Sequence, residues 1–160
     1  MLYRFLDTGR QAIPQFEIEA RQHGAKLIEA EHMLLALASK SDSEAAKLLN
    51  HSGLDHQRLA SALRDEHRRS LAFAGVQVPD GAPAEATKLE GSLSFGTSAK
   101  VALVRALLAS RSHRPRRARL KDVDLLRGIL LAELGTVPRA LAIAGVDRAT
   151  LISQTKAGEG

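Results

Sequence analysis

Two segments of the 160-residue chain repeat each other at a fixed distance, and this repeat constrains the fold more than any other feature. Residues 44–55 and 136–147 each show the pattern of a short helix followed by Gly, an aliphatic residue and Asp. The upstream residues 31–37 match 123–129 at the same offset of 92 residues. One unit of about 70 residues would bury only a marginal core, so we expect two units to pack around a shared core.

Each unit is predicted to hold four helices. In the first unit, residues 16–23 form a helix that Pro14 either begins or kinks, in the second case within a longer helix from near Asp7. The apolar residues 30–39 predict a helix buried on most sides. A short helix capped from within residues 41–44 follows, and then a helix capped by Asp55.

The second unit repeats this order. Thr97 or Ser98 is expected to cap a helix that runs to about Ser110, and Asp122 opens an apolar helix. The segment from Thr136, with Pro138 at an early position, starts a third helix, and Asp147 caps the last one.

The predicted fold class is all-α, with two tandem four-helix repeats related by pseudo-twofold symmetry. Aromatic residues make up 3% of the chain, which favours a helical core of Leu, Ala, Ile and Val. Residues 76–92 contain Pro79, Gly81, Pro83 and Gly91 and are predicted to be a linker. The expected organisation is a first repeat at 1–75, the linker at 76–92, a second repeat at 93–155 and a tail at 156–160, all in one globular domain.

Composition excludes several classes of protein. The chain has no Cys, which excludes a disulfide scaffold and thiolate chemistry. It has no apolar run of membrane-spanning length and no signal-peptide pattern at its start, so we expect a cytoplasmic protein without membrane partners. The net charge of +5 comes from the second half, and most of it lies in the basic segment 111–121. That segment is either a solvated loop or a surface for nucleic acid or an acidic partner.

No catalytic constellation is present in the sequence, and we predict neither enzymatic activity, a cofactor nor a metal site. The chain has no phosphate-loop motif, and no Ser has a nucleophile-elbow context. His51 and His56 are a poor metal pair, and His32 is expected to be a buried, hydrogen-bonded side chain. The pairs Glu17/Glu19 and Asp65/Glu66 are interpreted as solvated helix faces.

The first unit also carries a family pattern: Glu19-Ala20-Arg21, then Gly24, then the residues 28–37, which include Glu31-His32 before Met33-Leu34-Leu35. Gly53-Leu54-Asp55 and Gly145-Val146-Asp147 match the ends of the family's repeats, and Leu93-Ser94-Phe95 resembles the segment that opens its second repeat. On these residues the chain resembles the Clp N-terminal (Clp repeat) domain, which precedes the ATPase rings of ClpA, ClpC and ClpB unfoldases. The resemblance covers residues 2–155.

The resemblance implies a domain that binds proteins or peptides: a Clp substrate, an adaptor or a Clp ATPase. In ClpC relatives each repeat also binds phosphoarginine through a Glu and a Thr. Here the Glu positions fall on Glu31 and Val123, and the Thr positions fall on Leu6 and Gly96. One of the four groups is present, which argues against phosphoarginine binding, weakly in the first unit and strongly in the second.

The leading hypothesis is a stand-alone, non-catalytic protein-binding module that serves as adaptor, regulator or decoy in a Clp protease system. Its candidate partner-binding residues are Glu31, Asp7, Arg114, Arg116, Arg117 and Arg119. The alternative is a nucleic-acid-binding protein that uses the segment 111–121, which we disfavour because no aromatic residue is interleaved for base stacking.

Overall fold

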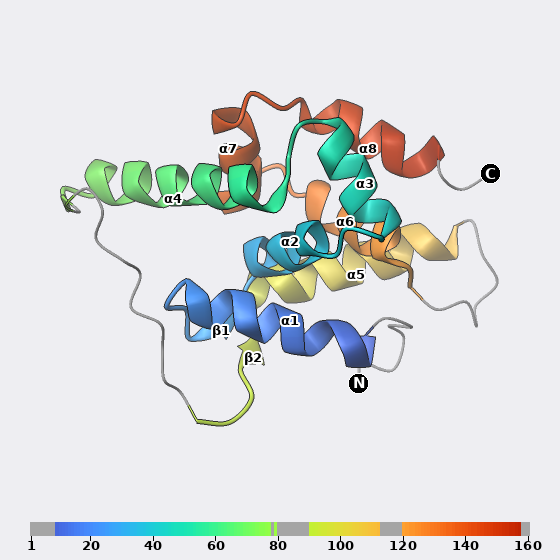
Figure 1. The fold of residues 1–160 in the computed structure, drawn as a ribbon, viewed down its shortest axis with the longest axis horizontal. Helices are drawn as coiled ribbons and strands as arrows, with labels where there is room; N and C mark the ends of the chain where they lie inside the picture. The colour runs from blue at the N-terminus through green and yellow to red at the C-terminus, as the bar shows by residue number, and fades with distance from the viewer. Residues whose placement is uncertain (1–8, 78, 80–89, 113–119, 158–160) are drawn as a thin grey trace.

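The computed structural model describes residues 9–77, 79, 90–112 and 120–157, and side chains from residue 12 onward. These ranges hold eight helices and one short strand pair (Figure 1). The helices are α1 Gly9–Gln22, α2 Ala30–Ser39, α3 Glu44–His51, α4 His56–Phe73, α5 Thr97–Arg111, α6 Asp122–Leu130, α7 Thr136–Ile143 and α8 Arg148–Ala157. None of the helices within these ranges combines the length and the apolarity needed to cross a membrane.

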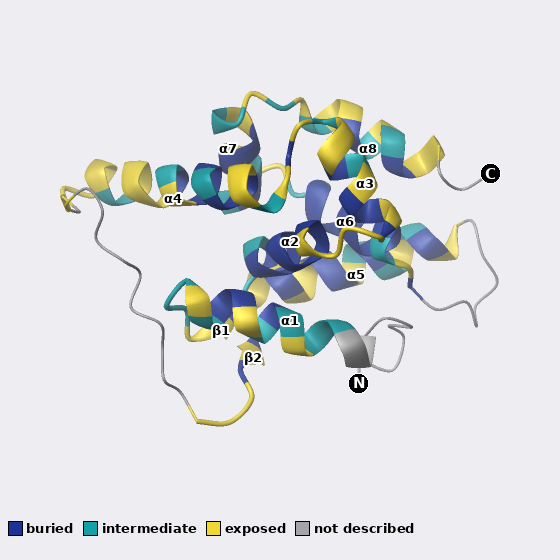
Figure 2. Ribbon diagram, in the orientation of Figure 1, coloured by how far each residue is buried: buried dark blue, intermediate teal, exposed yellow. Residues whose placement is uncertain are grey.

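Helix α2 occupies the centre of the core. Eight of its residues are buried, and only Glu31 and Ser39 escape burial. It packs against α1, α3, α4, α5 and α6, which explains why its sequence is apolar on nearly every side (Figure 2). The prediction of a helix buried on most sides is confirmed.

The two groups of four helices interlock in a symmetric manner. Helix α4 packs along α7, and α8 packs against α3, so the fourth helix of each group lies on the third helix of the other (Figure 1). At the centre, α2 contacts α6, its counterpart in the repeat. The fold class predicted from the sequence is confirmed.

Helices α5 and α6 approach each other closely at Gly128. A Cβ atom placed on Gly128 would lie 2.3 Å from the backbone oxygen of Ala102 and 2.7 Å from the Cβ of Ala106. Only glycine permits this contact without a shift of the backbone.

Several predicted helix starts are confirmed by hydrogen bonds. The side chains of Ser43 and Asp55 accept from the backbone amides of Ala46 and Arg58, and Asp147 accepts from the amide of Thr150. Pro14 lies inside α1, so the alternative of a longer first helix is the one observed.

Two features differ from the sequence predictions. Thr97 and Ser98 do not cap α5: its N-cap is Gly96, which has no side chain. Strand β1 (Leu27–Ile28) pairs in parallel with β2 (Ser94–Phe95), with Ile28 opposite Phe95. Two-residue strands carry no alternation that a sequence pattern could reveal. The proposed linker is mostly outside the described residues, and the repeat boundaries stay a prediction.

Candidate functional site

A groove of about 540 Å³ lies where the N-terminus of α2 meets the first turns of α5 and the connection between α6 and α7. We call it the Glu31 groove. Its polar side is made by Glu29, Glu31, Thr97, Ser98 and Arg105, and its apolar side includes Ile129, Leu134, Val137 and Pro138. Leu134 is 90% exposed, which is far from usual for a leucine and gives the groove an apolar rim.

Glu31 is the one side chain in the first turn of α2 that is directed out of the core. Desolvation raises the pKa of the Glu31 carboxyl above its usual value, and the negative charges of Glu29 and Glu66 raise it further, while a hydrogen bond with the backbone of Glu31 itself acts in the opposite direction. The ionised carboxylate is therefore disfavoured in the free domain although Arg105 also lines the groove, and further positive charge would stabilise it. A cation brought by a ligand would supply that charge.

The Glu29 carboxylate, by contrast, joins the N-terminal ends of α2 and α5. Its Oε2 accepts hydrogen bonds from the backbone amide of Ser98 at 3.0 Å and from the Ser98 hydroxyl at 2.5 Å. The Ser98 oxygen in turn accepts from the amide of Ala30 at 2.9 Å, so the first turns of α2 and α5 satisfy each other's free amides. Gly96 makes room for this contact, because a Cβ there would lie 1.8 Å from Oε1 of Glu29.

His32 has a structural role next to Glu31. Its Nδ1 accepts a hydrogen bond from the backbone amide of Glu29 at 2.9 Å, so the ring closes the start of α2. Burial lowers the pKa of His32 to about 4, with a further contribution from His23. The expectation of a buried, hydrogen-bonded histidine is confirmed. Asp124 makes the corresponding bond in the second repeat, where its Oδ2 accepts from the amide of Lys121 at 2.7 Å.

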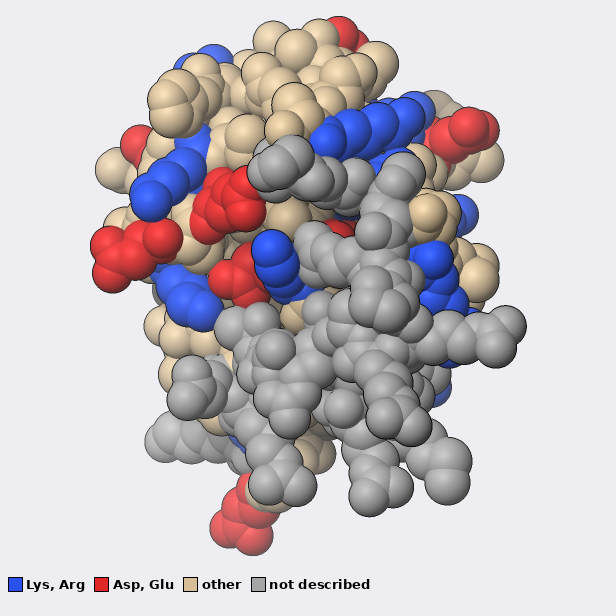
Figure 3. All heavy atoms as spheres, turned by 90° about the vertical axis from the view of Figure 1, so that its right-hand side faces the viewer, with Lys and Arg blue, Asp and Glu red and all other residues tan. Residues whose placement is uncertain are grey.

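Of the six predicted site residues, the structure describes only Glu31. Glu31 lines the groove, whereas Asp7, Arg114, Arg116, Arg117 and Arg119 lie outside the described residues. Val123, the counterpart of Glu31, is 2% exposed and faces inward. On the face shown in Figure 3, the described Lys and Arg side chains are interspersed with Asp and Glu.

The sequence reasoning missed the other half of the groove. It compared Glu31 with positions in its own repeat, but most of the described residues that line the groove with Glu31 belong to the other repeat, from α5, α6, α7 and the α6–α7 connection. No local signal in the sequence shows this pairing, because it is set by the packing of the two units.

Two acidic residues interpreted as solvated are buried, and that interpretation is wrong. Glu19 is 2% exposed and its Oε1 lies 2.9 Å from Nε2 of His56. Glu66 is 4% exposed, and its Oε1 accepts from Nε of Arg139 at 2.7 Å. Both partners come from other helices, so the charge pattern of a single helix could not predict the burial. Among the described residues, no three His, Asp or Glu side chains gather where they could hold a metal ion.

The family follows from comparison with known proteins. The family model for the Clp repeat (R) N-terminal domain matches residues 4–114. The chain belongs to this family. No curated protein sequence matches the chain significantly.

Solved structures agree with the Clp N-terminal fold. The N-terminal domain of the caseinolytic protease associated chaperone ClpD from Arabidopsis thaliana is similar, with a TM-score of 0.69 and 18% identity over 98% of this chain and 96% of that one. A structure from a malarial protein secretion system has a TM-score of 0.65 and 16% identity over 97% and 94% of the two chains. At these identities the likeness concerns the fold alone. A Clp N-terminal domain is a protein-binding module, and this chain contains no phosphate-loop motif of the ATPase modules.

Proposed function

We propose that this Clp N-terminal domain is a non-catalytic module that binds protein segments in the Glu31 groove, as an adaptor, regulator or decoy for clients of a Clp protease system. The observation that carries the proposal is a groove in which the Glu31 carboxylate, whose ionised form is disfavoured by desolvation, lies beside an exposed apolar rim. Family membership supports protein binding as the kind of function, and the lining of the groove supports this surface as the proposed binding site.

The groove favours a cationic side chain with an apolar stem. An arginine or lysine would place its charge on Glu31 and lay its methylene groups along Val101 and Leu134, which are 40% and 90% exposed. Arginine fits better, because its planar guanidinium bonds a carboxylate with two parallel hydrogen bonds. We therefore propose an arginine-bearing segment of a client or adaptor as the ligand.

Titration of the domain with labelled peptides tests this ligand. A peptide with one arginine in an aliphatic context should bind, and its citrulline version, which lacks the charge, should bind roughly tenfold more weakly. Glu31→Gln should abolish this difference. Glu44→Gln removes an equally charged, exposed residue from the first turn of α3 and serves as the matched control.

The same peptide with its arginine phosphorylated distinguishes a site for arginine from a site for phosphoarginine. The ionised Glu31 and Glu29 repel a phosphate unless donors surround it, so we expect the phosphorylated peptide to bind no more tightly than the arginine peptide. Equal binding of all peptides to the native domain and to Glu31→Gln would remove the groove from the proposal.

The biological role needs partners from the source cell. Affinity capture with the native domain and with Glu31→Gln should recover Clp components or their clients only with the native domain. Recovery of the same proteins with both would place the interface elsewhere on the molecule.

A further inference from the structure

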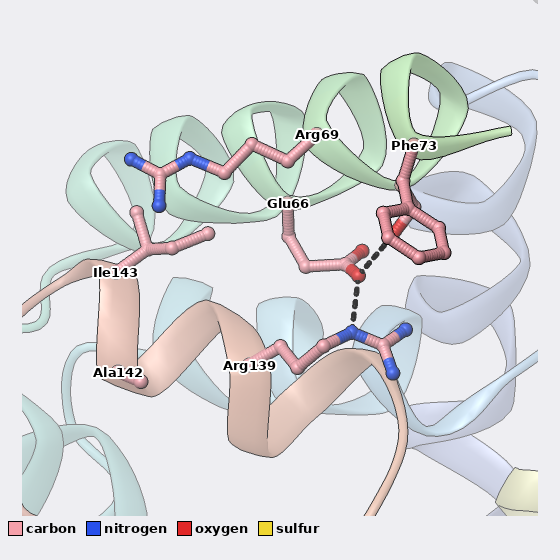
Figure 4. A pocket seen from close by; sticks show the side chains of 7 residues that line it. Glu66, Arg69, Phe73, Arg139, Ala142 and Ile143 are labelled. Atoms are coloured by element: carbon pink, nitrogen blue, oxygen red, sulfur yellow. Dashed lines mark hydrogen bonds and ion pairs between the residues drawn. The ribbon is translucent and has the colours of Figure 1, made fainter. Parts of the chain in front are cut away.

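A second groove, of about 600 Å³, lies between the C-terminal half of α4 and helix α7 (Figure 4). We call it the α4–α7 groove. It is lined by Glu66, Arg69, Ser70, Phe73, Arg139 and Ile143, together with Ala142. None of these residues lines the Glu31 groove.

Phe73 gives this groove an exposed apolar end. It is 96% exposed on the last turn of α4, and Ala142 and Ile143 add apolar surface from α7. Phe73 has the highest exposure among the large hydrophobic side chains described as exposed. An aromatic ring left in water at the edge of a groove is typical of a surface that a partner covers.

Among the described residues, Glu66 is the only carboxylate that lines this groove, and it is already neutralised. Oε1 of Glu66 accepts from Nε of Arg139 and from the hydroxyl of Ser70, both at 2.7 Å. The bond to Glu66 fixes the side chain of Arg139, which is 57% exposed. The terminal nitrogens of Arg139 are directed away from Glu66 in Figure 4. Arg69 lies across the other end of the groove near Ile143. The lining therefore carries an excess of positive charge next to apolar surface.

The positive charge of the α4–α7 groove favours some binding partners over others. A second copy of the chain, joined by a twofold axis through the groove, would bring Arg69 and Arg139 against their own counterparts, and like charges in such a contact are unfavourable. An acidic segment would instead meet both arginines.

We propose that the α4–α7 groove is a second docking surface, which takes an acidic partner segment that carries an aromatic or aliphatic anchor. The anchor packs against Phe73 and Ile143, and the carboxylates bond Arg69 and the terminal nitrogens of Arg139. The two grooves thus accept segments of opposite charge. The Glu31 groove can fail its tests without affecting this proposal.

Fluorescence anisotropy with the full chain tests the second surface. The probe is a labelled short peptide rich in Asp and Glu with one Phe and one Leu, and a version with both apolar residues changed to Ser is the comparison. Arg69→Glu and Phe73→Ala should each weaken binding of the first peptide roughly tenfold. Arg64→Glu changes an exposed charge of the same helix outside the groove and should have little effect. Arg139 is left intact, because its loss would leave Glu66 buried without its cation.

Three results would overturn the proposal. One is no binding of the acidic peptide to the native chain. Another is equal loss with Arg64→Glu and Arg69→Glu, which would show unspecific attraction to a basic helix. The third is self-association of the chain that Phe73→Ala abolishes, which would make a second copy the occupant. Unchanged binding of the acidic peptide to Glu31→Gln, together with the losses above, would establish two independent surfaces.

Discussion

At the scale of single residues, Glu31, the proposed binding residue, is expected to oppose the stability of the fold. Its pKa is raised in the folded protein by desolvation first and by Glu29 and Glu66 next. An acid whose folded pKa lies above its unfolded value loses stability as pH rises through that range, so ionised Glu31 destabilises the fold at neutral pH. Glu31→Gln should therefore raise the Tm at pH 7 while it weakens peptide binding. A lower Tm would show that Glu31 stabilises the start of α2.

His32 predicts a pH dependence at the same helix end. Its pKa is lowered to about 4 by burial first and by His23 next, so the unfolded chain takes up a proton as pH falls below about 6.5 while the folded chain does not. The stability that neutral His32 contributes is complete above that pH and falls by up to about 3 kcal/mol between pH 6.5 and 4.

Urea unfolding at a series of pH values measures this loss. His32→Asn keeps an acceptor for the Glu29 amide but does not titrate, so its stability should fall less over the same interval. Parallel curves for the native protein and the variant would contradict the assignment of the proton to His32.

At the scale of the elements, the contact between α5 and α6 depends on Gly128. Alanine normally stabilises a helix interior relative to glycine, but here its methyl group would meet the backbone of Ala102. Gly128→Ala should therefore destabilise the domain by about 2 kcal/mol, as overpacking commonly does. Thermal or chemical denaturation checks this, with Ser153→Ala on the exposed face of α8 as the control. A more stable Gly128→Ala variant would show that the helices can separate without penalty.

Some helix caps can be predicted from the local sequence, and others cannot. Ser43, Asp55 and Asp147 cap helices within their own segment; the sequence predicts Asp55 and Asp147 by residue and places the other cap within residues 41–44. The cap of α5 comes from Glu29, which is 69 residues away from Ser98, so no local motif could predict it. The burial of Glu19 and Glu66 was missed for the same reason, since their partners come from other helices.

At the scale of the whole molecule, helices of one repeat pack against helices of the other. Because α4 lies on α7 and α8 lies on α3, neither group of four helices buries its apolar surfaces alone. We expect a single cooperative unfolding transition for the full chain, with the same midpoint by circular dichroism and by calorimetry. A fragment 1–75 should lack stable tertiary structure, and a folded fragment would contradict the shared core.

The sequence predicts the repeat and the helix order because these depend on spacing and local caps, and it indicates the family through its resemblance to the Clp repeat domain. It also singles out Glu31, through the family resemblance. It does not predict the groove, because the residues that face Glu31 arrive only when the repeats interlock. The α4–α7 groove was missed as well, since Phe73 reads as an ordinary apolar residue until the structure shows it 96% exposed.

The most direct test of the central claim is an NMR titration of the isotope-labelled domain with the arginine peptide. We predict shift changes at Glu31, at the first turns of α5 and around Leu134, with small changes on α4 beyond Arg64. Glu31→Gln should remove them at the same peptide concentration. Shift changes confined to other surfaces, or identical changes in Glu31→Gln, would contradict the assignment of the Glu31 groove as the protein-binding site.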